Sequence, residues 1–97
     1  MIECEFIRLG GKVYLNLWAP IMHLGRKVSI GELRQCVNQL KAIERRIPAM
    51  KNMFPHVAGW AIWIYHSKQA HKKQIEKLGT KKFTDTDDRT WYIKEIV

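Results

Sequence analysis

The most apolar stretch of the chain, residues 57–65, reads VAGWAIWIY. Apolar residues stand at both odd and even positions, so a strand built from this stretch has apolar side chains on both of its faces. Such a strand is typical of the centre of a parallel or mixed sheet. The stretch is far shorter than the roughly 20 apolar residues that a membrane-spanning helix needs. We therefore predict a central strand here, and the rest of the fold is built around it.

A β-hairpin is predicted before this strand, at the start of the chain. Residues 3–8 alternate, Gly10-Gly11 follow, and residues 12–19 alternate again, with Val13 and Leu17 on one face and Trp18 on the other. Two adjacent glycines supply the positive φ angles that a tight hairpin turn requires. Pro20 cannot donate to a ladder, so the second strand is expected to end there.

A helix is predicted between the hairpin and the central strand. The segment Ser29-Ile30-Gly31-Glu32 has the spacing of a capping box, and apolar residues recur at helical spacing from Leu33 to Ile43. Pro48 is expected to stop the helix. A helix that joins two strands of one sheet makes a parallel βαβ unit the default arrangement.

The remaining residues predict a second helix and a final hairpin. Ser67 is the expected cap of a helix that ends at Leu78-Gly79. Residues 81–86 and 90–96 form the predicted hairpin, around a turn at residues 87–89. The prediction is a single α/β (α+β) domain over residues 1–97, with a small mixed sheet and the element order β-β-α-β-α-β-β.

The 97-residue chain is strongly basic. Seventeen Lys and Arg against nine Asp and Glu give a net charge of +8, which favours polyanionic partners such as nucleic acid, a nucleotide-like cofactor or an acidic protein surface. Cys4 and Cys36 are predicted to be small core residues in a reduced compartment. With no apolar leader segment at its start, the chain is expected to be cytoplasmic, without a membrane partner.

Two segments of the chain resemble the GNAT superfamily of N-acetyltransferases, specifically its C-terminal core without the usual first strand and first two helices. The segment Arg26-Lys27-Val28-Ser29-Ile30-Gly31 is similar to the family's pyrophosphate loop, Arg/Gln-x-x-Gly-x-Gly/Ala, although Ser29 replaces its first glycine. The segment from Ser67 to Gly79 resembles the family's penultimate helix. Short phage-encoded members are the expected source, and the host cytoplasm would then be the location.

The resemblance implies acetyl-CoA as the cofactor. Backbone groups of Leu17 and Trp18 would contact its pantetheine arm. The pyrophosphate would be bound by the loop residues Arg26, Lys27, Val28, Ser29, Ile30 and Gly31. The physical basis is that free N–H groups and the positive dipole end at the start of a helix attract anions. The alternative is an ordinary capped helix that follows a basic loop.

Catalysis would require a base that deprotonates an acceptor amine. His66, at the end of the central strand, is the predicted base. Tyr65 or Tyr92 is the predicted acid that protonates the departing thiolate. The reaction implied is acyl transfer from acetyl-CoA to an amine of a protein or small molecule.

Two other functions stay open. One is a catalytically degenerate GNAT-like binding protein, such as a phage-type inhibitor or virion component. The other is a basic nucleic-acid-binding or acidic-partner-binding module that uses Lys68, Lys72, Lys73 and Lys77 of the second helix. No metal site is expected from the spacing of His and Cys, the tryptophans are expected in the core, and a sheet edge covered by a second copy would make a homodimer.

Overall fold

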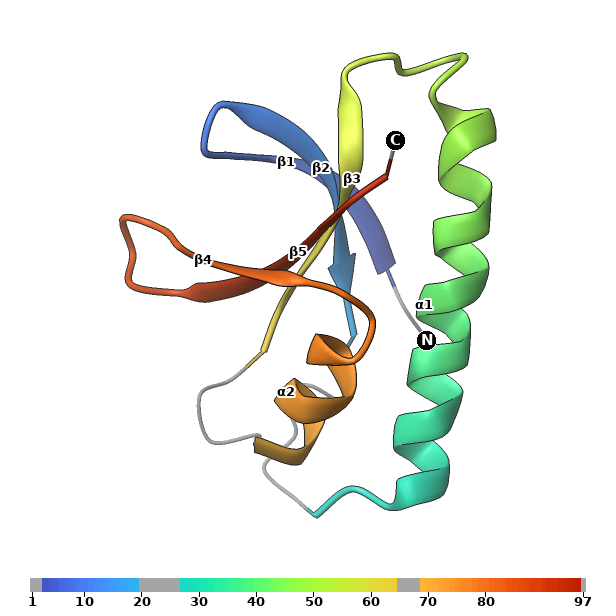
Figure 1. The fold of residues 1–97 in the computed structure, drawn as a ribbon, viewed down its shortest axis with the longest axis vertical. Coiled ribbons are helices and arrows are strands. Elements are labelled where there is room, and N and C mark those ends of the chain that lie inside the picture. Colours follow the sequence, from blue (N-terminus) through green and yellow to red (C-terminus); the bar gives the residue numbers. More distant parts are fainter. Residues whose placement is uncertain (1–2, 20–26, 65–68, 97) are drawn as a thin grey trace.

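The computed structural model describes residues 3–19, 27–64 and 69–96. Within these residues the protein is a small α+β fold with a five-stranded mixed sheet and two helices (Figure 1). The elements are β1 (Glu3–Leu9), β2 (Lys12–Trp18), α1 (Ile30–Met50), β3 (Val57–Trp63), α2 (Gln69–Glu76), β4 (Lys81–Thr84) and β5 (Thr90–Glu95). The predicted order of strands and helices is confirmed.

The sheet has the strand order β1-β2-β3-β5-β4, so the apolar stretch of the sequence is indeed the central strand. β2 and β3 are parallel and are joined through α1, while the other neighbouring pairs are antiparallel. The first turn has Gly10 and Gly11 at φ of 57° and 82°, as the hairpin prediction requires.

Both helices pack on one face of the sheet. The core on this side joins Leu40 and Ile47 of α1, Ile75 of α2, and Trp60 and Tyr92 of the sheet. The stripe predicted for α1 faces this core, since its buried residues include Leu33, Cys36 and Leu40. Burial of these side chains is the main driving force that holds α1 along the sheet.

Among the described residues, no helix residue belongs to the apolar cluster on the opposite face of the sheet, where strand side chains bury one another. Its apolar cluster consists of strand residues alone: Leu9, Tyr14, Ala61, Trp91 and Ile93. The turn of the first hairpin lies close to β4, although β1 and β4 are the two outer strands of the sheet. A Cβ atom added at Gly10 in this turn would lie 3.2 Å from the ring of Phe83 in β4. The two hairpins therefore project to the same side, away from α1 (Figure 1).

Several boundaries differ from the predictions. The expected stop at Pro48 is wrong, because α1 continues to Met50. Proline removes one backbone bond there, but Ile47 is fully buried and its carbonyl accepts from Lys51 N at 3.0 Å, so the last turn stays anchored. β4 ends at Thr84 rather than Thr86 because Asp85 begins the turn: its carboxylate accepts the N–H groups of residues 87 and 89.

The cysteine prediction is correct for one residue only. Cys36 is buried in the core, whereas Cys4 is exposed. Cys4 lies on the helix-facing side of β1, which is an outer strand that α1 does not cover. Burial raises the pKa of the Cys36 thiol to about 11, so this thiol stays protonated at neutral pH.

Candidate functional site: a basic groove between the helices

A groove of about 650 Å³ lies between α1 and α2. The α1 residues that line it follow one another at helical spacing. The remaining lining residues are Ala70 and Gln74 of α2 and Lys77, which directly follows this helix. The lining residues are Ile30, Leu33, Arg34, Val37, Asn38, Lys41, Ala70, Gln74 and Lys77. The volume lies within the range of roughly 300–1,000 Å³ that is usual for small-molecule sites.

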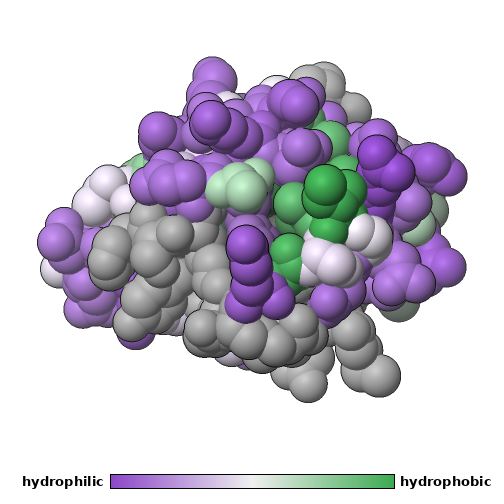
Figure 2. All heavy atoms as spheres, turned by 90° about the horizontal axis from the view of Figure 1, so that it is seen from below, coloured by the Kyte–Doolittle hydropathy of each residue, from purple (hydrophilic) through white to green (hydrophobic). Residues whose placement is uncertain are grey.

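The groove has an apolar floor and a cationic rim. Leu33 is buried and Val37 is half-buried, whereas Arg34, Lys41 and Lys77 are exposed. The lining residues include three cations and no acid. Figure 2 views the end of the molecule where α2 and the start of α1 lie, and shows apolar surface set among hydrophilic side chains. This combination suits a ligand that has both an apolar part and phosphate or carboxylate groups.

The start of α1 is closed by its own side chains. Ser29 is the N-cap, its Oγ accepts from Glu32 N at 3.1 Å, and the Glu32 carboxylate lies 3.5 Å from Ser29 N. The predicted capping box is therefore present. An anion at this helix end meets a carboxylate, so much of the positive charge available to it comes from side chains farther along the groove. Ile30, at 72% exposed, connects the helix start to the groove.

The parallel strands β2 and β3 separate at their C-terminal ends. Their pairing runs as far as Asn16 opposite Ala61, but β2 continues to Trp18 and β3 to Trp63. Each strand stays paired with its outer neighbour over these last residues. Ligands of open α/β sheets commonly bind at such carboxyl ends. The Leu17 side chain is buried in the core, and the Trp18 ring is 6.1 Å from that of Trp63 on the opposite face.

The structure places the predicted catalytic residues unequally. Tyr92 is 1% exposed and lies in the core opposite Ile62 of β3, outside the groove lining. Burial raises the pKa of the Tyr92 hydroxyl, and the nearby charge of Glu76 raises it further, so this hydroxyl keeps its proton. Arg26, Tyr65, His66, Ser67 and Lys68 lie outside the described residues.

The groove joins two predictions that the sequence kept apart. Ile30 belongs to the segment expected to bind the cofactor, and Lys77 to the lysines expected to bind a polyanion, yet both line one cavity. Lys73 is exposed and Lys72 is half-buried on α2, whereas Lys77 lies just past the end of α2 at Glu76, so the helix is shorter than predicted. Arg34 and Lys41 line the groove but were not among the predicted site residues. Their spacing on α1 was visible, but only the packing of α2 beside α1 makes them part of a groove.

The tryptophans divide between core and surface. Trp60 and Trp91 are buried as predicted, whereas Trp18 is 37% exposed and Trp63 is half-buried. The Arg89 guanidinium lies 4.8 Å from the centre of the Trp63 ring, a cation–π distance. Among residues 3–19, 27–64 and 69–96, His, Cys and acidic side chains form no group of three that could hold a metal ion.

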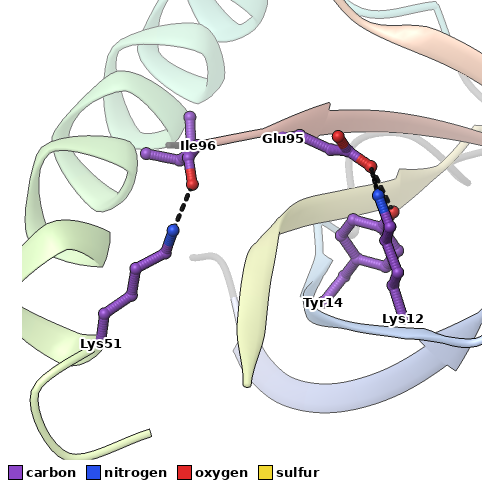
Figure 3. A network of polar contacts seen from close by, with 5 residues as sticks. All are labelled: Lys12, Tyr14, Lys51, Glu95 and Ile96. Atoms are coloured by element: carbon purple, nitrogen blue, oxygen red, sulfur yellow. Dashed lines mark hydrogen bonds and ion pairs between the residues drawn. The ribbon is translucent and has the colours of Figure 1, made fainter. Parts of the chain in front are cut away.

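Three carboxylates are hydrogen-bonded in ways that lower their pKa. Glu95 accepts hydrogen bonds from Lys12 Nζ at 2.9 Å and from Tyr14 Oη at 3.0 Å, and these bonds lower its pKa (Figure 3). They connect β5 to β2 across β3. The Lys51 ammonium, also drawn in Figure 3, donates to the backbone carbonyl of Ile96. Asp85 accepts from Trp91 Nε1 at 2.8 Å, the largest cause of its lowered pKa. Burial opposes ionisation of Glu44, but bonds from Trp60 and Lys94 outweigh it.

Acid is therefore expected to destabilise the fold. The pKa values of the three carboxyl groups are lower in the folded protein than in the unfolded chain, where they are about 4. Above this ordinary pKa, the ionised carboxylates contribute their full stabilisation to the folded state. This contribution is lost as the pH falls through the lower, folded-state values. Urea unfolding between neutral pH and pH 2 measures the effect, and Asp85→Asn should flatten the pH dependence. Equal unfolding free energies at neutral pH and pH 2 would contradict these assignments.

None of the protein-family models, curated proteins or solved structures compared with this chain matches it. Neither helix is long and apolar enough to cross a membrane, a finding that covers the described residues only.

Proposed function

We propose that the chain binds an acyl-CoA in the groove between α1 and α2 and is a minimal N-acyltransferase of the GNAT type, acting on an amine in the cytoplasm. The observation that carries the proposal is the position of this groove. It begins at the first residue of α1, has three cations around an apolar floor, and belongs to a fold in which the parallel strands β2 and β3 separate. The order of helices and strands also supports a GNAT-like fold.

The chemistry of the groove matches the parts of such a ligand. Arg34, Lys41 and Lys77 would form charge-assisted hydrogen bonds with phosphates. Leu33 and Val37 would contact apolar or planar parts of the cofactor. The separated ends of β2 and β3 would leave backbone groups of Leu17 and Trp18 for the pantetheine arm. In this form of the proposal, groove cations supply the charge that the capped start of α1 lacks.

In the proposed reaction, the acceptor nitrogen attacks the thioester carbonyl, an N–C bond forms, and the C–S bond breaks to release CoA. His66 would take the proton from the amine, and a tyrosine would return a proton to the thiolate. Because Tyr92 is enclosed in the core, we assign this second role to Tyr65. Release of free thiol in the presence of amine substrates, and its loss in His66→Ala, would test the chemical step.

Charge reversal in the groove is expected to weaken CoA binding. Arg34→Glu and Lys77→Glu each replace an attraction by a repulsion, so we expect each to raise the Kd by about 10- to 100-fold. Arg46→Glu is the matched control, since Arg46 is exposed on α1 but does not line the groove. Calorimetry with CoA and acetyl-CoA measures the effect. Absence of binding to the unaltered protein, or an equal loss in Arg46→Glu, would refute the proposal.

A second function is favoured by the Glu32 carboxylate at the start of α1. This carboxylate occupies the place where a pyrophosphate would be bound, which suits a non-catalytic protein that docks a polyanion on the groove and on Lys73. Two kinds of protein would have such a surface. One is a catalytically degenerate GNAT-like protein that binds an acidic protein, such as a phage-type inhibitor or a virion component. The other is a nucleic-acid-binding module. Such a module would bind oligonucleotides with an affinity that falls steeply with salt, and Lys73→Glu would reduce the slope. Salt-insensitive binding would exclude it.

A further inference from the structure

A second apolar surface lies far from the groove, where β1 meets the loop after α1. Phe6, Met53 and Phe54 are 48%, 77% and 44% exposed, and the rings of Phe6 and Phe54 are 5.0 Å apart. We call these three side chains the Phe6 patch. A hollow of about 300 Å³ adjoins it, lined by Phe6, Val13, Met53, Phe54, Pro55, His56 and Val57. Apolar side chains exposed together in this way commonly mark an interaction surface.

The patch borders an open edge of the sheet. β1 is the outer strand next to β2, and over the described residues its other side pairs with no strand. Its helix-facing side is also open, since Cys4 and Phe6 are both exposed there. An outer strand with free backbone N–H and C=O groups is a template for the addition of another strand.

We propose that this edge and the Phe6 patch form a two-fold interface with a second copy of the chain, through antiparallel pairing of β1 with β1. Charge favours this occupant. The chain carries a charge of +8, so two copies repel each other wherever lysines meet. The sequence of β1 instead has two acids, Glu3 and Glu5, before one base, Arg8. Antiparallel pairing brings Arg8 of each strand past the acidic start of the other. The charges lie on opposite faces of the sheet and form no direct pair, so their attraction acts at longer range and offsets part of the repulsion.

Symmetry fixes a register that experiments can test. A two-fold axis normal to the sheet pairs residues on the same face, and centring it on the patch sets Phe6 opposite Phe6 of the second copy. Cys4 then lies opposite Arg8 of the second copy. The three exposed side chains would bury roughly 300 Å² per copy, and the strand edge adds to this. The total lies below the usual value of about 800 Å² per partner, so a weak dimer is expected.

Sedimentation equilibrium on the full chain tests the interface, over concentrations from about 1 to 300 µM. The apparent mass should rise from 11.5 kDa towards twice that value. Phe6→Glu sets two carboxylates against each other at the axis and should abolish the rise. Ile30→Glu changes an equally apolar residue, 72% exposed but outside the patch, and should leave the rise unchanged. Phe6 is half exposed, so circular dichroism should show that the variant still folds.

Oxidative cross-linking tests the register. The paired Cα atoms of an antiparallel ladder lie about 4.5–5.5 Å apart, within the range of a disulfide. In Arg8→Cys, the new thiol should therefore join to Cys4 of the second copy. Ile7→Cys is the control, because its side chain points to the other face and should not cross-link to Cys4. A protein that remains monomeric at the highest concentration, or a dimer unaffected by Phe6→Glu, would overturn the proposal and leave the edge to another protein's strand.

Discussion

Replacing Gly59 by alanine is expected to lower the free energy of unfolding by about 3 kcal/mol or more. A Cβ atom at this position would lie 1.9 Å from the Lys94 carbonyl oxygen and 2.8 Å from the Glu95 Cα atom. Both atoms belong to the backbone of β5, which pairs with β3 at this point. The clash can be relieved only if the two strands move apart. Because a domain of this size is stable by only about 5–15 kcal/mol, a large part of its stability would be lost.

Urea unfolding of Gly59→Ala, followed by far-UV circular dichroism, measures the loss. Gly31→Ala is the matched control, because a Cβ atom there meets only Ser29 Oγ, at 3.9 Å, within a helix. Alanine is favoured over glycine inside helices by about 1 kcal/mol, so this variant should be slightly more stable than the unaltered protein. Similar stabilities for the two variants would show that β5 does not approach β3 as closely as described.

Replacing Trp60 by alanine is expected to cost about 3–5 kcal/mol. Trp60 is 0% exposed in the core between the sheet and the helices. Its indole Nε1 donates to Glu44 Oε1 at 2.9 Å, and Lys94 Nζ lies 2.9 Å from the same oxygen. The residue therefore connects α1, β3 and β5 at one point. Truncation would leave a cavity and remove one of the two groups that hold the Glu44 carboxylate.

Trp60→Phe separates these two contributions. Phenylalanine keeps an aromatic ring in the core but cannot donate to Glu44, so it should cost about 1–3 kcal/mol. Unfolding free energies from urea titrations of both variants provide the comparison. Equal losses would mean that the hydrogen bond dominates, whereas a loss below about 1 kcal/mol for Trp60→Ala would contradict the described packing. Since α1 also lines the groove, the proposed function implies that a loosened α1 would weaken CoA binding there as well.

The sequence predicted helix and strand boundaries correctly where neighbouring residues alone determine them. Gly10 and Gly11 make the turn with positive φ angles, and the Ser29–Glu32 capping box begins α1 where expected. Local signals were less reliable where tertiary packing, or its absence, decides the outcome. Pro48 weakens a helix locally, but burial of Ile47 outweighs that cost and α1 continues. Cys4 alternates like a core residue, yet it is exposed because β1 is an outer strand.

The candidate site was only partly predictable for the same reason. Sequence placed positive charge on both helices and a helix start near the basic loop. It could not show that Arg34, Lys41 and Lys77 line one cavity, because this depends on how α2 packs beside α1. The close approach of β5 to Gly59 and the exposure of the Phe6 patch are likewise consequences of packing.

By itself, the sequence determined the order of strands and helices, the central position of β3 and the basic character of the surface. These follow from local periodicity, turn residues and charge, which act between residues close in the chain. Tertiary structure alone decided the groove, the separation of β2 from β3 and the open edge at β1. Those features arise where segments distant in the sequence meet, and the free energy of their contacts depends on the shapes of both partners.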